Sequence, residues 1–189
     1  MRSFLALPLP VDLQDELEDL ALGLRAGRLV PAENLHVTLA FLGEQSEADL
    51  EQLHQELLTL SFDPLLLKIQ GLEARGGKQP GLLWARIAPD ATLTALHKAI
   101  RGKLRLCGLE LPRERFRPHI TLARFPRPQR RGDGEEILSF LRAEGGYASR
   151  AFPCDRFALF RSELGADGAS YEELAGYPFC RQPPLKGVK

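Results

Sequence analysis

The sequence predicts an α+β fold built from two similar lobes of antiparallel sheet with helices packed outside. Three observations support this. Strand-like segments occur in adjacent pairs, which favours antiparallel pairing, and leucine-striped helical segments lie between them. The pattern His-x-Thr-Leu-Ala occurs twice, at residues 36–40 and 119–123, once in each half of the chain. With 189 residues and 44% apolar content, the chain can form a single two-lobed domain over residues 1–189.

Seven apolar segments bounded by turn residues are expected to form strands. The first, SFLALPLP, is ended by its prolines, and Gly43 closes the second. Turn-rich sequences at residues 75–81 and 165–168 join two of the strand pairs. The expected strands are residues 3–10, 35–43, 65–74, 81–89, 119–125, 155–164 and 170–179. Residues 180–189 are expected to form a flexible tail.

Four segments show the periodicity of amphipathic helices. Acidic residues lie in the first turn of the first helix, where the helix dipole favours negative charge. Ser46 and Asp49 form a capping pair for the second, and Asp90 and Thr92 open the third, which Gly108 ends. The fourth covers residues 134–146 and ends at a double glycine. The apolar stripes are Leu13, Leu17, Leu20 and Leu24; Leu50, Leu53, Leu57 and Leu60; and Leu93, Leu96, Ile100 and Leu104.

Charge and cysteine content narrow the functional classes. The formal net charge is zero, so no overall field favours a nucleic acid or a membrane surface. Arginine nevertheless outnumbers lysine 19 to 6, and seven arginines lie between residues 113 and 131. The three cysteines are widely spaced and give no zinc or disulfide pattern. Without a signal-peptide core or a membrane span, we expect a cytoplasmic monomer that makes no membrane contact.

The repeated motif places polar side chains on one face of a strand. Residues two apart in a strand share a face, so His36 points with Thr38, and His119 points with Thr121. The residues between them are apolar and belong to the core. If the lobes set these strands side by side, a cleft receives two imidazoles and two hydroxyls. Arg124 would lie on the opposite face of a flat strand and reach the cleft only if the strand ends or twists.

Two histidines and two threonines in one cleft suit acid–base chemistry at phosphorus. One imidazole can remove a proton from a nucleophile while the other protonates a leaving group. The hydroxyls can bind the non-bridging phosphate oxygens. A structural role for the histidines and a zinc site are the alternatives, but no further ligand lies at a suitable spacing, so no metal or other cofactor is expected. His54 and His97, on predicted helices, are expected to have structural or solvent-edge roles.

The sequences VPAENLHVTLAFLGE and FRPHITLARF resemble the paired signatures of the two-histidine phosphoesterases. The branch of RNA 2′,3′-cyclic phosphodiesterases, also called 2′-5′ RNA ligases, is the most similar. Similarity to this branch extends from RSFLALPLP to FALFRSELGADGASYEEL, nearly the whole chain. The resemblance implies two lobes related by a pseudo-twofold axis around a central active-site cleft. It also implies metal-free hydrolysis of an RNA 2′,3′-cyclic phosphate to a 2′-phosphate.

The resemblance also assigns roles to residues. His36 would be the general acid that protonates the departing 3′ oxygen, and His119 the general base that activates water, although spacing alone leaves their order open. Thr38 and Thr121 would hold phosphate oxygens, and Arg124 would bind the phosphate or stack on the base. Ser162 and Tyr171 match a late Ser…Tyr pattern and are further candidates for substrate binding.

The arginine-rich segments around the second motif suit an RNA backbone. Arg130 and Arg131, in the loop after it, are candidate substrate contacts, with a solvated loop as the alternative. Phe41, Phe125 and Trp84 could stack on a base, but we expect each to lie in the core. Two other functions remain open. One is reversible 2′-5′ ligation of cyclic-phosphate and 5′-hydroxyl RNA ends, and the other is RNA binding without catalysis, which would not require two matched histidines.

Overall fold

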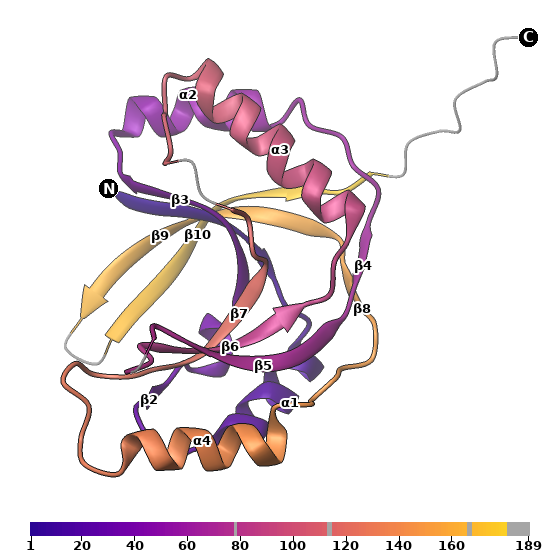
Figure 1. The fold of residues 1–189 in the computed structure, drawn as a ribbon. Helices are drawn as coiled ribbons and strands as arrows, with labels where there is room; N and C mark the ends of the chain where they lie inside the picture. The colour runs from indigo at the N-terminus through magenta and orange to yellow at the C-terminus, as the bar shows by residue number, and fades with distance from the viewer. Residues whose placement is uncertain (78, 113–114, 166–167, 181–189) are drawn as a thin grey trace, which may run out of the picture.

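The structure, a computed structural model, describes all residues except 78, 113–114, 166–167 and 181–189. The strands are β1 (Arg2–Pro8), β2 (Arg28–Leu29), β3 (His36–Glu44), β4 (Leu65–Leu67), β5 (Ile69–Arg75), β6 (Leu82–Ile87), β7 (His119–Arg124), β8 (Phe152–Cys154), β9 (Arg156–Gly165) and β10 (Gly168–Pro178). The helices are α1 (Val11–Leu22), the 3₁₀ turn η1 (Ala32–Asn34), α2 (Glu47–Leu57), α3 (Ala91–Leu106) and α4 (Asp133–Glu144). Helices separate most of the strands along the chain, but β4, β5 and β6 follow one another directly, as do β8, β9 and β10 (Figure 1).

The main sheet brings the two His-x-Thr strands together at its centre. Its order is β10-β9-β1-β3-β7-β6-β5, with β2 paired to β7, and every pair is antiparallel. The lobes meet where β3 pairs with β7, and Val37 is the register partner of Ile120. The predicted α+β fold is confirmed, and each lobe contributes one His-x-Thr strand.

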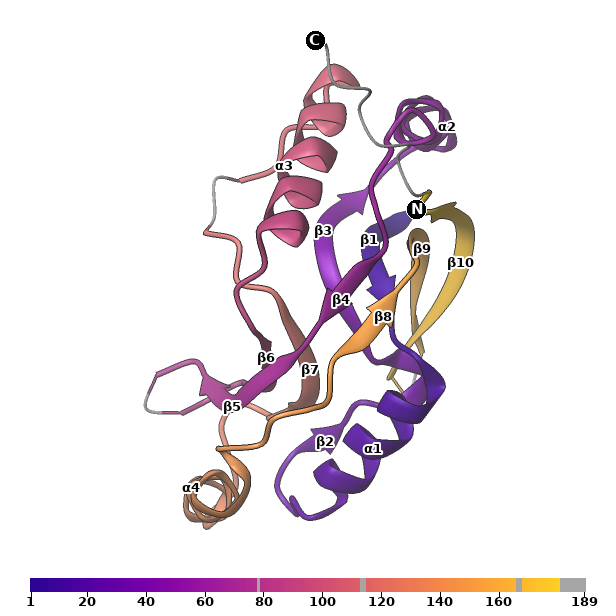
Figure 2. The ribbon, with the colours of Figure 1, turned by 90° about the vertical axis from the view of Figure 1, so that its right-hand side faces the viewer.

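The helices lie in two groups at opposite ends of the molecule. The pair α2 and α3 lies at the end near β1 and β3, and the pair α1 and α4 lies at the other, near β2 and β5 (Figures 1 and 2). Helix α1 follows β1 but contacts β7, whereas α3 follows β6 but contacts β3. Each lobe is therefore assembled from both halves of the chain, so the lobes do not correspond to the sequence halves that contain the repeated motif.

The prediction of a single strand at residues 65–74 is wrong. The segment divides into β4 and β5, and β4 leaves the main sheet to pair with β8. Strands β2 and β8, with two and three residues, were not predicted because an alternating pattern needs a longer segment to be recognised. The turn expected at 165–168 joins β9 to β10, and its residues 166–167 lie outside the described residues, as does the expected tail beyond Cys180.

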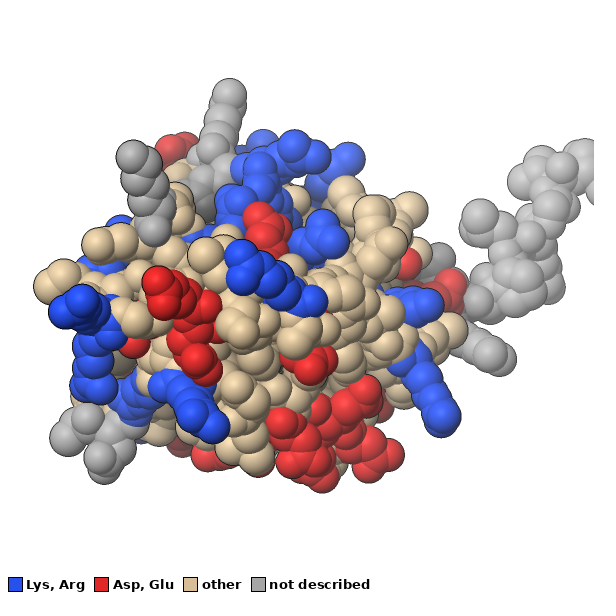
Figure 3. All heavy atoms as spheres, turned by 60° about the horizontal axis from the view of Figure 1, so that its bottom comes forward, with Lys and Arg blue, Asp and Glu red and all other residues tan. Residues whose placement is uncertain are grey.

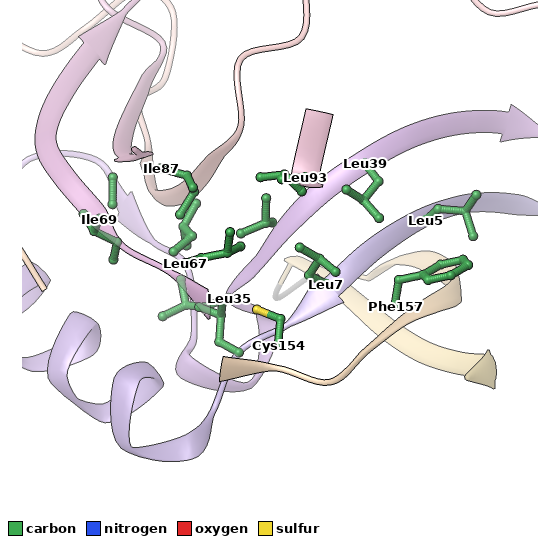
Figure 4. Close-up of a cluster of buried hydrophobic side chains, with 14 of the residues drawn as sticks. Leu5, Leu7, Leu35, Leu39, Leu67, Ile69, Ile87, Leu93, Cys154 and Phe157 are labelled. Carbon is green, nitrogen blue, oxygen red and sulfur yellow. The ribbon is translucent and has the colours of Figure 1, made fainter. Parts of the chain in front are cut away.

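Local signals set the helix ends as predicted. Ser46 and Asp49 form a capping box at α2, and the Asp90 carboxylate accepts a hydrogen bond from the backbone N–H of Leu93 at the start of α3. Gly108, just after α3, has φ +73°, a value that glycine adopts without steric cost. The three predicted stripes pack into one core. In Figure 4, Leu5, Leu39 and Phe157 come from the main sheet, and Leu67 and Cys154 come from the β4–β8 pair.

Acidic side chains gather in one part of the surface, whereas elsewhere acidic and basic side chains lie next to each other (Figure 3). Figure 3 views the end that carries α1 and α4, where Asp and Glu gather at the lower edge and Lys and Arg lie mainly along the left and upper edges. The zero net charge therefore hides local patches of each sign. Among the described residues, no helix is long and apolar enough to cross a membrane.

Candidate active site

Both His-x-Thr strands contain a bulge directly after the threonine. In β3, the register with β1 passes from Thr38 to Ala40, so Leu39 has no partner of its own. In β7, the register with β6 passes from Thr121 to Ala123 and skips Leu122 in the same way. Two consecutive residues are therefore both buried, Leu39 and Ala40 in β3 and Leu122 and Ala123 in β7. Beyond each bulge, a side chain points to the face opposite the one that regular alternation would give it.

The bulges set the direction of the side chain five positions after each histidine, which is Phe41 in β3 and Arg124 in β7. A flat strand would send Arg124 to the face opposite His119, and the bulge returns it to the same face. Arg124 accordingly lines the cleft, as does Phe41, its counterpart in β3. Phe41 is 65% exposed, so the prediction that it belongs to the core is wrong. Phe125, at 6% exposure, lies in the core as predicted.

The cleft is a narrow hollow of roughly 320 Å³ where the lobes meet. It collects five of the predicted site residues, namely His36, Thr38, Thr121, Arg124 and Tyr171, together with Val30, Asn34 and Phe41. Extending the antiparallel register by one residue in each direction sets His36 across from Thr121 and Thr38 across from His119. The two motifs are thus arranged crosswise at the centre of the sheet.

His36 is held in one tautomer by its surroundings. Its Nδ1 lies 2.7 Å from the Asn34 carbonyl oxygen, which can only accept, so Nδ1 carries the hydrogen. In the neutral ring, Nε2 then accepts a hydrogen bond from the Thr38 hydroxyl at 3.0 Å. Burial lowers the pKa of His36 to about 4, and the charges of Arg124 and His119 act in the same direction, against the bond to Asn34.

Aromatic side chains from the neighbouring strands enclose His36. The ring of Phe4, on β1, lies 4.9 Å from the imidazole centroid, and Tyr171, on β10, meets it edge-on at 5.4 Å. The Asn34 side chain donates to the Ala169 carbonyl and so holds the start of β10 against this site. Sequence reasoning missed Phe4 and Asn34, because their roles depend on strands that are distant in the chain.

His119 repeats the local geometry of His36. Its Nδ1 lies 2.8 Å from the carbonyl oxygen of Arg117, again two residues earlier, which leaves Nε2 to accept a proton in the neutral ring. Burial lowers the pKa of His119, and the nearby Arg75 and Arg124 lower it further, while the bond to Arg117 and the charge of Glu73 oppose them. Both imidazoles therefore favour the neutral form at neutral pH.

The remaining predicted residues are placed less centrally. Ser162 is half-buried on β9 as the register partner of Tyr171, but it is not among the residues that line the cleft. Arg130 and Arg131 are exposed just before α4, and neither lines the cleft. His54 exchanges a hydrogen bond with Tyr177, and His97 stacks on Phe116, so both histidines make structural contacts.

The histidines are not part of a metal cluster within the described part of the chain. No group of three His, Cys, Asp or Glu side chains there is placed to hold a metal ion. The polar groups that line the cleft are hydroxyls, one imidazole, one amide and a guanidinium. Such a set favours an anionic ligand, and a phosphate group matches both its charge and its hydrogen-bond donors.

A two-lobed antiparallel sheet with paired His-x-Thr strands at its centre defines a phosphoesterase of the two-histidine class. The chain belongs to the 2′-5′ RNA ligase superfamily, whose family model matches residues 9–166. The resemblance seen in the sequence is thereby confirmed.

Individual relatives agree with this membership. An RNA 2′,3′-cyclic phosphodiesterase of Thermus thermophilus is 31% identical over 186 residues, covering 92% of this chain and 88% of the relative. One from Archaeoglobus fulgidus is 26% identical over 179 residues, with 92% and 98% coverage. The crystal structure of E. coli LigT complexed with 3′-AMP matches the fold with a TM-score of 0.77 at 22% identity, covering 95% of this chain and 98% of LigT.

Proposed function

We propose that this protein hydrolyses RNA 2′,3′-cyclic phosphate ends to 2′-phosphates without a metal ion. The observation that carries the proposal is the repeated anchoring of the imidazoles. Each Nδ1–H is bound to a main-chain carbonyl two residues earlier, which leaves each Nε2 as the proton-transfer atom. The names of the relatives, which are RNA 2′,3′-cyclic phosphodiesterases, support the same activity.

The reaction needs one proton to move at each side of the phosphorus atom. Water attacks the cyclic phosphate while Nε2 of His119 takes its proton. The bond from phosphorus to the 3′ oxygen breaks, and protonated His36 delivers a proton to that oxygen. Family resemblance assigns the order of the two histidines. The product is a 2′-phosphate with a free 3′-hydroxyl, and the proton gained by His119 returns to His36 through solvent between turnovers.

The acid must acquire its proton despite the low pKa of His36. The anionic phosphate supplies the missing electrostatic support, because a negative charge close to an imidazole favours its charged form. Thr38, Thr121 and Arg124 are proposed to hold the non-bridging oxygens, where negative charge concentrates in the transition state. Tyr171 and Ser162, on the neighbouring strands, are proposed to contact the nucleoside.

The same site, complete within one chain, supports a monomeric enzyme. Both motifs come from a single copy and meet at its central strand pair. Cys107, Cys154 and Cys180 are free thiols, which suits the reducing cytoplasm that we propose as its location.

The proposal is tested by incubating the protein with 2′,3′-cyclic AMP and with a cyclic-ended oligonucleotide in excess EDTA. We expect turnover of both substrates and, by phosphorus NMR, a 2′-phosphate product. If EDTA abolishes turnover and zinc or manganese restores it, the metal-free mechanism is wrong. A 3′-phosphate product would show that the leaving oxygen has been misassigned.

A further inference from the structure

A second arginine, Arg28 on the short strand β2, lies beside Arg124 at the rim of the cleft. The two are register partners across the β2–β7 pair, so their side chains stand next to each other on one face. Val30, two residues after Arg28, lines the cleft, whereas Leu29 between them packs against the core. Arg28 is exposed and is not itself a lining residue, so it lies at the rim on the cleft side of the sheet.

The Arg28 side chain reaches from β2 to the start of β10. Its guanidinium lies against the backbone of Gly168, where a Cβ atom would be 2.7 Å from Cζ and 3.1 Å from Nη1 of Arg28. A side chain at Gly168 would therefore displace the guanidinium. The next residue, Ala169, accepts a hydrogen bond from the Asn34 side chain, and β10 continues to Tyr171, which lines the cleft. The guanidinium is thus held between two segments that both lead into the cleft.

Two positive charges meet here without an acidic partner. In the part of the chain that the structure describes, neither Arg28 nor Arg124 forms an ion pair. Like charges at directly opposite positions of neighbouring strands destabilise a sheet. An anionic ligand that places negative charge at both guanidinium groups would relieve this repulsion.

The cyclic phosphate supplies only one of these negative charges, and Arg124 is proposed to hold it. At an RNA end, the same ribose carries a second phosphate on its 5′ oxygen, which links it to the rest of the strand. Free 2′,3′-cyclic AMP has no such group. A guanidinium can bind a phosphate through two parallel hydrogen bonds, so Arg28 suits this second phosphate.

We infer that Arg28 binds the phosphate on the 5′ side of the terminal nucleotide and thereby selects RNA ends over free cyclic nucleotides. The inference rests on the proposed function, because it takes the cyclic phosphate to lie at Arg124. Arg28 has no part in proton transfer. Its contribution is to substrate selection, through a contact that a cyclic mononucleotide without a 5′-phosphate does not make.

The test compares kcat/KM for three substrates that differ only on the 5′ side. They are 2′,3′-cyclic AMP, the same nucleotide with a 5′-phosphate, and the dinucleotide ApA with a 2′,3′-cyclic end. We expect the wild type to prefer both 5′-phosphate-bearing substrates over cyclic AMP by about tenfold or more, the effect of one charged hydrogen bond. Arg28→Gln should reduce both preferences to about one. Arg28→Lys, which keeps the charge but not the planar group, should restore only part of them.

Arg25→Gln is the matched control. It removes an exposed arginine three residues earlier, where the backbone N–H of Arg25 donates to Glu136 of α4, and it should leave the preferences unchanged. Preferences that survive in Arg28→Gln would overturn the inference. Equal losses on all three substrates would also overturn it, because Arg28 would then act on the cyclic phosphate.

Two further outcomes separate the inference from the function on which it rests. A loss confined to the dinucleotide would show that Arg28 contacts the second nucleoside rather than the phosphate, and would overturn the inference. A wild type that hydrolyses all three substrates equally well would overturn the inference and leave the proposed function intact. If the wild type hydrolyses none of them, the proposed function itself fails, and the inference fails with it.

Discussion

Trp84 stacks on His119, with ring centroids 3.6 Å apart and ring planes inclined by 16°. On the same face of the sheet, the Arg75 guanidinium lies 5.1 Å from the Trp84 ring centroid. This arrangement fixes the plane of the His119 imidazole, while the Arg117 carbonyl fixes its tautomer. The sequence predicts a core position for Trp84, but its half-buried ring instead positions a catalytic candidate.

Replacing Trp84 by leucine should lower kcat for 2′,3′-cyclic AMP by roughly 10- to 100-fold, because a small displacement of a catalytic group is costly. KM should change much less, since the phosphate ligands Thr38, Thr121 and Arg124 are untouched. Trp84→Phe, which keeps a flat ring against the imidazole, should recover most of the rate. Unchanged kcat in the leucine variant, measured by steady-state kinetics, would show that the stack has no positioning role.

The pH dependence follows from the lowered pKa of both histidines. Catalysis needs one proton on the pair, and both pKa values lie below 6.5, that of His36 at about 4. The singly protonated free enzyme therefore becomes scarcer as pH rises through neutrality. We expect kcat/KM for cyclic AMP to fall by up to about tenfold per pH unit above 6.5. Because bound phosphate raises the pKa of an imidazole, the fall in kcat should begin at a higher pH than the fall in kcat/KM. A kcat/KM that stays flat from about pH 6 to 9 would contradict this.

The two threonines can be tested without changing the shape of the cleft. Thr38→Val and Thr121→Val each remove a hydroxyl proposed to hold a phosphate oxygen. Each should lower kcat/KM for cyclic AMP by about tenfold or more, the usual effect of losing a hydrogen bond to a charged group. The matched serine variants, which retain the hydroxyl, should stay close to wild type. Valine variants as active as the serine variants would remove the threonines from the mechanism.

The arginines should divide into two groups. Arg124→Ala should reduce kcat/KM for cyclic AMP and for a cyclic-ended oligonucleotide alike, because Arg124 lines the cleft. Arg130→Gln/Arg131→Gln should lower kcat/KM for the oligonucleotide only, because it should weaken binding of the longer RNA. The slope of log binding constant against log salt concentration should become shallower by about one for each arginine that no longer neutralises a phosphate. Arg142→Gln, near the other end of α4, serves as the control.

The measurement compares both substrates at two salt concentrations. Equal losses on both substrates in the double variant would place the loop in the active site or in the folding of α4. No loss on either substrate would mean that Arg130 and Arg131 form a solvated surface, the alternative that the sequence leaves open.

The sequence was sufficient to predict the features that depend on residues close together in the chain. The helix stripes and the caps at Ser46 and Asp90 follow from side chains a few positions apart, and the structure contains them. The pairing of His36 with Thr38 on one face needed only the two-residue period of a strand. The repetition of the motif then predicted that two such strands belong together, as they do in β3 and β7.

What the sequence did not reveal depends on contacts between distant strands. The bulges that turn Phe41 and Arg124 into the cleft appear only in the register with β1 and β6. A leucine followed by an alanine is compatible with a regular strand, so neither residue signals the extra position. The exchange of helices between lobes, and the packing of Phe4 and Trp84 against the two histidines, likewise follow from topology.

The central claim is that His36 and His119 act together as acid and base, and the most direct test is the turnover of 2′,3′-cyclic AMP in EDTA by three variants. His36→Ala and His119→Ala should each lower kcat by about 10²–10⁴-fold, the usual contribution of a general acid or base. The double variant should be little slower than either single variant, because the two imidazoles work as a unit. Full activity in either single variant would contradict the account.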